Sequence, residues 1–167
     1  MGSKQLATPS SPLEHFERYG RSYPGLSQLL EDMFDTMRKE SGIGLAAPQI
    51  GTNLRVVIFG FEESQRYPQE KEVPFTILIN PEIKPLSDDM EEAWEACLSI
   101  PGLRGLVPRY TEIEYSGFEP DGNLICRKVE GFHARVVQHE CDHLDGVLYP
   151  QRIKDLRFFG FEDELRL

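Results

Sequence analysis

Long apolar stretches are missing from this sequence. Its apolar runs are only about four to five residues long, whereas a helix that crosses a bilayer needs roughly 20. No apolar segment follows the first few residues, so we expect no signal peptide. These absences argue against a role in the membrane and predict a cytoplasmic protein, although the same pattern would fit an organelle.

Positive charge is scarce as well. The chain has 28 acidic and 18 basic residues, which give a formal net charge of −10. No cluster of Lys or Arg interrupts this acidic character, and an acidic surface repels phosphate backbones. The composition therefore argues against a nucleic-acid partner.

Cysteine is rare too, with three in the chain. An odd number without an export signal is typical of a reducing compartment, where thiols serve as ligands or stay free. Repeats and linkers are also missing, and 167 residues suffice for one domain with a sizeable core. The sequence leaves the oligomeric state open.

Hydrophobic periodicity predicts two helices with strands between them. The first helix covers about 24–41, with Gly42 placed to cap it, and the second covers 131–145, with Gly146 after it. Strand-like patterns cover 54–59, 75–79, 92–99, 107–118 and 124–129. Residues 1–24 are irregular, and residues 151–167 are too mixed to assign. This order predicts an α+β fold with antiparallel or mixed sheets, an N-terminal helix and a short C-terminal segment.

Residues 139–143 read His-Glu-Cys-Asp-His. A helix advances about 100° per residue, so His139 and His143 lie nearly above one another on one face. Both imidazoles can then reach one metal ion, while Glu140 can exchange protons with a water on it. The alternative is a solvated helix face that carries two His by chance. An apolar stripe through Phe132 and Val136 continues into the two His, which favours a buried pair with a metal partner.

Two His leave a tetrahedral ion incomplete. The candidates for a third ligand are the carboxylates and Cys97, Cys126, Cys141, His15 and His133. Cys141 points about 200° around the helix from His139, so we interpret it as a packing or surface thiol. Cys126 is expected in the core and His133 at the helix start. Cys97 precedes a Pro-Gly turn that could bring it to the helix, but spacing alone does not separate a ligand from a core residue.

Three segments resemble, in order, the three signature motifs of the peptide deformylase family. They are GIGLAAPQ at 42–49, EACLS at 95–99 and QHECDH at 138–143. The similarity covers roughly residues 28–150, and three ordered motifs are far more specific than one. Alone, the first would also begin like a phosphate-binding glycine loop, but no strand is expected before it and no helix after it.

The resemblance implies a metal centre whose ligands are Cys97, His139 and His143, with a water in the open position. It implies iron(II) as the ion in cells, which zinc, nickel or cobalt can replace. It also implies antiparallel sheets around a central helix that carries the HExxH motif. On this basis residues 1–167 form a single metallohydrolase domain that begins with an irregular segment, 1–24.

The same resemblance implies hydrolysis of the formyl group on the N-terminal methionine of newly made proteins, with release of formate. Glu140 would be the general base and then the general acid. The Gln49 amide and the Leu98 backbone N–H would bind the oxyanion. The methionine side chain would lie in an apolar pocket, and the candidates for this pocket are Ile43, Gly44, Phe132 and Val136. The expected partners are formyl-methionyl nascent polypeptides, which can be met at the ribosome.

Ala96 departs from the family motif, which has Gly at this position. A positive φ there would cost roughly 1 kcal/mol, whereas an extended backbone would tolerate Ala but place a methyl group beside the peptide. Two other functions fit parts of the pattern. One is a non-catalytic module that binds metal and N-terminal peptides. The other is a zinc endopeptidase, which would complete its site with a carboxylate or a third His.

Overall fold

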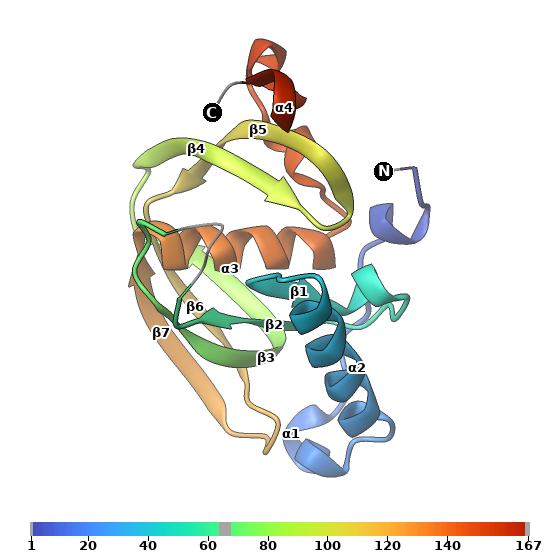
Figure 1. Ribbon diagram of the computed structural model, residues 1–167. Coiled ribbons are helices and arrows are strands. Elements are labelled where there is room, and N and C mark those ends of the chain that lie inside the picture. Colours follow the sequence, from blue (N-terminus) through green and yellow to red (C-terminus); the bar gives the residue numbers. More distant parts are fainter. Residues whose placement is uncertain (1, 64–67, 166–167) are drawn as a thin grey trace.

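The computed structural model describes residues 2–63 and 68–165 (Figure 1). The two ends of the expected domain 1–167, and the start of the expected segment 1–24, therefore lie outside the described residues. Between Gly2 and Pro24 the chain forms three short helical turns: η1 (Gln5–Ala7), α1 (Phe16–Tyr19) and η2 (Gly20–Ser22). Phe16 anchors this segment because its side chain is fully buried.

Helix α2 (Leu26–Lys39) buries one apolar stripe, made by Leu26, Leu29, Met33 and Met37. Its end differs from the expectation for Gly42. Ser41 takes the left-handed conformation with φ 52°, and the Gly42 N–H donates to the Met37 carbonyl at 2.9 Å. The left-handed residue that closes the helix is therefore Ser41 rather than Gly42, and the helix ends at Lys39 rather than near residue 41.

The larger sheet has five antiparallel strands in the order β1-β2-β3-β6-β7. Its strands are β1 (Gly44–Ala46), β2 (Val56–Phe61), β3 (Val73–Pro85), β6 (Glu112–Phe118) and β7 (Leu124–Glu130). Every residue of β2 is buried. Val57 and Phe59 belong to the core on the α3 side, while Val56 and Ile58 belong to the core on the α2 side. The unbroken apolar run is therefore explained by helices on both faces.

The smaller sheet has the antiparallel order β4-β5-β8 and contains β4 (Met90–Cys97), β5 (Ile100–Tyr110) and β8 (Phe159–Phe161). The expectation of one strand over 107–118 is wrong. The run is divided at Thr111, and its halves β5 and β6 pair in different sheets. The Thr111 N–H donates to Asp89, and its carbonyl accepts from the Gly131 N–H. Apolar alternation continues through this change of sheet, so the pattern alone did not reveal it.

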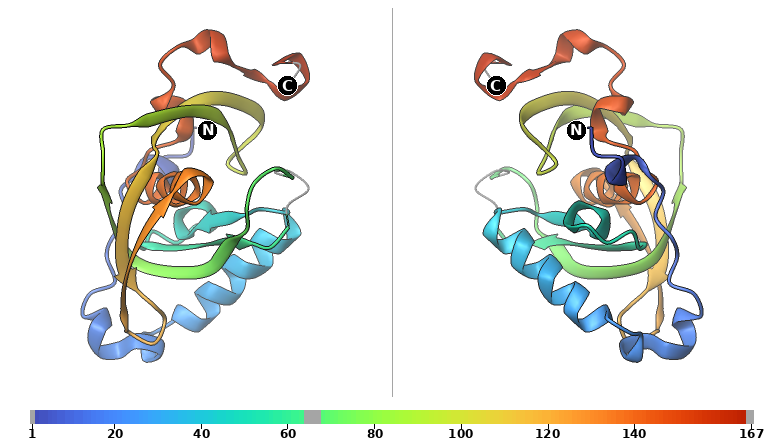
Figure 2. Two further views of the ribbon diagram at one scale, coloured as in Figure 1. Left: turned by 90° about the vertical axis from the view of Figure 1, so that its left-hand side faces the viewer. Right: turned by 90° about the vertical axis from the view of Figure 1, so that its right-hand side faces the viewer.

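Helix α3 (Gly131–Leu144) lies between the two sheets, with β4 and β5 on one side and β1 to β3 on the other (Figures 1 and 2). Gly146 follows it with φ 72°, a conformation that ends helices. The remaining helical elements are η3 (Ala47–Ile50), η4 (Tyr149–Arg152), η5 (Leu156–Phe158) and α4 (Glu162–Leu165). The α+β class with antiparallel sheets is confirmed, and β1 and β8 are additional strands.

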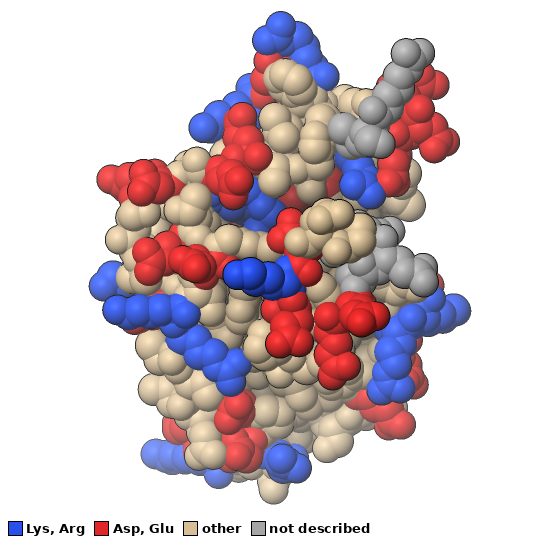
Figure 3. Space-filling model, turned by 60° about the vertical axis from the view of Figure 1, so that its left-hand side comes forward, with Lys and Arg blue, Asp and Glu red and all other residues tan. Residues whose placement is uncertain are grey.

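The outer surface mixes both signs of charge. On the face drawn in Figure 3, acidic and basic side chains are interspersed among uncharged ones. None of the helices in the described ranges is long and apolar enough to span a membrane.

Candidate metal centre and active site

Cys97, His139 and His143 converge where the end of β4 meets α3. One potential ligand atom from each lies within 4.8 Å of the other two, and Cys97 Sγ is 3.3 Å from His143 Nε2. Ligands at about 2.0–2.3 Å from a tetrahedral ion are roughly 3.3–3.8 Å apart. The three side chains therefore fit around one ion with little movement.

The turn after β4 gives Cys97 its position. Cys97 pairs with Ile100 across this turn, and the Ser99 N–H donates to Cys97 Sγ at 3.4 Å. This hydrogen bond fixes the direction of the sulfur relative to the turn. The Cys97 side chain is buried, at 7% exposure, so a bound ion would be shielded from bulk water.

The two His differ in their surroundings. Burial and, to a smaller extent, the nearby charge of His139 together lower the pKa of His143 to about 3. For His139 burial also lowers the pKa, but hydrogen bonds and charge from Cys97 and Glu95 outweigh burial and raise it well above 6.5. A metal binds the neutral imidazole, so the shift at His143 favours its role as a ligand, whereas the shift at His139 opposes the loss of its proton.

Glu95 orients His139 and was missed by the sequence analysis. Its Oε2 lies 2.8 Å from His139 Nδ1, which leaves Nε2 for the metal. Arg109 binds both Glu95 oxygens at 2.9 Å, and Arg135 binds Oε1 at 2.8 Å. Burial would raise the pKa of Glu95, but these hydrogen bonds and charges hold it well below its usual range. The signal in the sequence was spacing: Glu95 lies two residues before Cys97, on the same face of a strand.

Glu140 is aimed at the same site. It is 5% exposed, and its Oε2 has no hydrogen-bond partner among the described residues. A Cβ at position 44 would collide with its carboxylate, so Gly44 permits the close approach of β1. Burial raises the pKa of Glu140 to about 7, against an opposing effect of the charge on His139. A carboxyl group with this pKa can accept and donate a proton near neutral pH.

Gln49 is held by a hydrogen bond at each end of its amide. Its Oε1 accepts from the Ala46 N–H at 2.7 Å, and its Nε2 donates to Ser99 Oγ at 3.1 Å. The same Nε2 lies 3.8 Å from Cys97 Sγ. The amide N–H groups therefore face the metal ligands rather than solvent.

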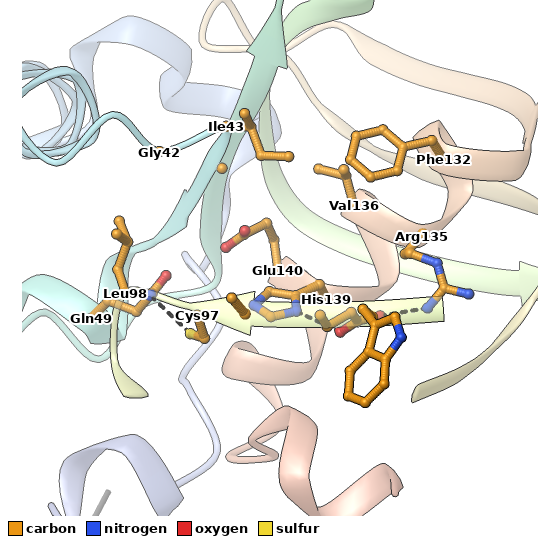
Figure 4. Close-up of a pocket in the computed structure, with 14 residues that line it drawn as sticks. Gly42, Ile43, Gln49, Cys97, Leu98, Phe132, Arg135, Val136, His139 and Glu140 are labelled. Carbon is orange, nitrogen blue, oxygen red and sulfur yellow. Dashed lines mark hydrogen bonds and ion pairs between the residues drawn. The ribbon is translucent and has the colours of Figure 1, made fainter. Parts of the chain in front are cut away.

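A cavity of about 550 Å³, including its open mouth, adjoins these groups. Figure 4 shows Ile43, Phe132 and Val136 at one side and Gln49, Leu98 and Cys97 at another. The full lining is Gly42, Ile43, Gly44, Gln49, Trp94, Glu95, Ala96, Cys97, Leu98, Phe132, Arg135, Val136, His139 and Glu140. The structure thus brings together every residue expected in the site, with His143 buried behind the cavity wall at 2% exposure.

The remaining Cys and His candidates lie elsewhere. Cys126 is exposed, so the expectation of a core position is wrong. It lies on β7, where Ile125 and Val129 are more buried and alternate residues face solvent. Cys141 is buried in the core, where burial raises the pKa of its thiol well above the usual range. His133 stacks edge-on against Phe59, away from the metal ligands.

Ala96 lies within β4 and lines the cavity. It does not have a positive φ, so replacing the family glycine here brings no left-handed strain. Any effect of this replacement is therefore steric rather than conformational.

Comparisons with known proteins agree with this geometry. The polypeptide deformylase family model matches residues 1–158. Peptide deformylase 1 of Bordetella pertussis is 58% identical over 165 residues, which cover 99% of this chain and 91% of that protein. Peptide deformylase 1 of Nitrosomonas europaea is also 58% identical, with 99% and 91% coverage.

Solved structures give the same result. A Met-Ala-Ser-bound class I type b peptide deformylase from Acinetobacter baumannii has a TM-score of 0.84 and 35% identity, covering 92% of this chain and 94% of that one. An actinonin complex of a peptide deformylase from Synechococcus elongatus has a TM-score of 0.77 and 33% identity, with 92% and 76% coverage. The chain therefore belongs to the polypeptide deformylase family, the metalloenzymes that remove the formyl group from N-formyl-methionyl peptides.

Proposed function

We propose that Cys97, His139 and His143 hold the catalytic ion of this deformylase. The observation that carries the proposal is their convergence within 4.8 Å, beside a buried carboxylate oxygen that lacks a partner in the described chain. We further propose that the ion is iron(II) in cells and that zinc, nickel or cobalt can replace it, because two imidazoles and a thiolate suit all four. When bound, the ion lowers the pKa of water from 15.7 to about 7 and polarises the formyl oxygen.

Glu140 is proposed as the group that moves the proton. Glu140 lines the cavity, and its Oε2 has no partner in the described chain. Its carboxylate would accept a proton from the attacking water and then give it to the leaving amine. Its pKa of about 7 supports both transfers at neutral pH. Gly44 contributes by letting the carboxylate lie against β1.

Gln49 and Leu98 are proposed to stabilise the charge that develops on the formyl oxygen. The Gln49 amide is fixed by its bonds to the Ala46 N–H and to Ser99 Oγ, and its second N–H, on the side of Cys97 Sγ, is the one proposed to meet the formyl oxygen. Leu98 follows the Cys97 ligand in the chain and lines the same cavity, and these two observations support its backbone N–H as the second donor. One such donor contributes about 3 kcal/mol, or a factor of roughly 100 in rate.

Ile43, Gly44, Phe132 and Val136 are proposed to bind the first residue of the substrate. Three of them present apolar side chains to the cavity (Figure 4), as a methionine side chain requires. Phe132 and Val136 lie one helical turn apart on α3, and Val136 is three residues before His139. The same helix therefore carries both the pocket and two of the ligands, which supports α3 as the central helix of a single metallohydrolase domain.

We propose that the natural substrates are nascent polypeptides with N-terminal formyl-methionine, including chains that are still attached to the ribosome. Binding without catalysis is not favoured, because Glu140 and Gln49 are both present and placed in the cavity. A zinc endopeptidase is not favoured either, because the third member of the cluster is a thiol.

A formate-release assay tests the proposal. The protein is prepared without oxygen, its metal is quantified, and formyl-Met-Ala-Ser is compared with acetyl-Met-Ala-Ser. We expect one equivalent of iron, formate release from the first peptide, and no acetate release from the second. Formate release by fully metal-free protein would contradict the proposed mechanism.

A further inference from the structure

Arg135 is a charged residue in the wall of an otherwise largely apolar part of the cavity. It lies on α3 one turn before His139, adjacent to Val136, and is 7% exposed. Figure 4 shows it beside Phe132 and Val136, with its guanidinium directed towards β4. A pocket that binds only a thioether side chain needs no buried cation.

The guanidinium is held rigidly. Its Nη1 donates to Glu95 Oε1 and to the Val107 carbonyl, both at 2.8 Å, and its Nη2 donates to the Glu91 carbonyl at 2.7 Å. These bonds fix the planar group, so little further entropy is lost when it binds a ligand.

Donor capacity is left over after these bonds. A guanidinium has five N–H groups, and three hydrogen bonds are formed within the described part of the chain. The Nε atom takes part in none of them, and it is not among the completely enclosed atoms without a partner. The Nε–H is therefore the donor that these bonds leave for a ligand in the cavity, which Arg135 lines.

We propose that Arg135 is a specificity-determining residue that donates a hydrogen bond to an acceptor near the end of the first substrate side chain. The deformylase then acts on peptides that begin with formyl-methionine sulfoxide as well as formyl-methionine. The inference rests on the proposed function of the cavity as the seat of that side chain.

The chemistry distinguishes three side chains of similar length. A sulfoxide oxygen is a strong acceptor, a thioether sulfur is a weak one, and norleucine has none. If the sulfoxide oxygen were buried without a partner, kcat/KM for the sulfoxide peptide would be lower by a factor of roughly 5–100, because an unsatisfied buried polar group is costly. A charged donor at the pocket wall removes this penalty.

The test compares formyl-Met(O)-Ala-Ser with formyl-Nle-Ala-Ser, using Arg135→Met as the variant. We expect the wild-type kcat/KM for the sulfoxide peptide to lie within about tenfold of that for the norleucine peptide. In Arg135→Met this ratio should fall about tenfold, the value of one charge-assisted hydrogen bond. Because both peptides share one enzyme preparation, a general loss of activity cancels in the ratio.

Arg109→Lys is the matched control. Arg109 also binds Glu95 but does not line the cavity, so its replacement should affect both peptides alike. Arg135→Lys keeps the positive charge and should retain part of the preference, which covers the case of an unfolded Arg135→Met. Calorimetry with the products adds a readout without turnover: the Kd of Met(O)-Ala-Ser, but not of Nle-Ala-Ser, should rise in the Arg135 variants.

The decisive quantity is kcat/KM for the sulfoxide peptide divided by kcat/KM for the norleucine peptide. The inference is overturned if this ratio is below about one hundredth in the wild type, or if it is unchanged in both Arg135 variants. It is also overturned if the ratio falls equally in Arg109→Lys. Failure of the proposed function looks different. In that case the wild-type protein releases no formate from formyl-Met-Ala-Ser or from the norleucine peptide.

Discussion

Glu95→Gln should weaken both the fold and the metal site. Glu95 is 6% exposed as a side chain, and its partners Arg109 and Arg135 are 4% and 8% exposed. Removal of one charge from a buried, hydrogen-bonded ion pair typically lowers the free energy of unfolding by roughly 3–5 kcal/mol. Because the amide keeps part of the hydrogen bonding, we expect a loss of about 3 kcal/mol in the free energy of unfolding. The carboxylate also orients His139, so the affinity for metal should fall by a factor of roughly 10–100.

The pH dependence gives this prediction a second signature. The pKa of Glu95 lies well below 4.5 in the folded protein, so folding is stabilised at every pH above about 4.5. This contribution is lost as the pH falls below 4.5 towards the folded-state pKa. The difference between wild type and Glu95→Gln should therefore be largest near neutral pH and shrink in acid.

Denaturant unfolding of metal-free protein and chelator competition of the loaded protein measure the two effects. Glu92→Gln is the control, because Glu92 is an exposed residue on the same strand. Equal stability and metal affinity for Glu95→Gln and Glu92→Gln would refute the assigned role of the network.

Three further predictions concern single residues. Glu140→Gln should keep the metal and the fold but lower kcat at least about a hundredfold, and loss of metal in this variant would make Glu140 a ligand or a support for one. Ala96→Gly should raise kcat/KM for formyl-methionyl peptides at constant metal content, because a methyl group that displaces the formyl carbon by about 1 Å can cost a hundredfold; equal kinetics would show that the methyl group is clear of the substrate. Burial and the charge of Arg127 lower the pKa of His133 below 6.5. Below about pH 6.5 this His binds a proton more readily in the unfolded chain than in the folded protein, so the free energy of unfolding should decrease as the pH is lowered. His133→Phe should flatten this fall in denaturant titrations between pH 7 and 5, and an unchanged slope would contradict it.

The elements that the sequence predicts best are those with a single buried face. The stripe of α2 and the helical spacing of His139 and His143 are local properties of the chain, and they survive in the structure. The division of the run 107–118 at Thr111 is not a local property, because it depends on which sheet each half of the run joins. Likewise Cys126 lies in a strand of alternating pattern, which suggested a core position, but β7 is an edge strand and Cys126 lies on its exposed face.

The candidate site shows the same division. The match to three ordered motifs selected Cys97, Gln49 and the HExxH residues, whereas the ionic network around them was not identified, although two of its members also line the cavity. Glu95, Arg109 and Arg135 come from three separate elements and meet only after the smaller sheet has packed on α3. Buried ion pairs of this kind leave no periodic signal in a sequence, since charged residues are ordinarily expected at the surface.

The central claim is that one ion, held by Cys97 together with the two His of α3, carries the deformylase reaction. The most direct measurement is metal content and formate release in Cys97→Ala and in Cys141→Ala, prepared side by side under anaerobic conditions. Both thiols are buried, so loss of a buried thiol is common to the two variants. Our account predicts that Cys97→Ala loses stoichiometric metal and activity, while Cys141→Ala keeps both. The reverse pattern, or full metal and activity in Cys97→Ala, would contradict it.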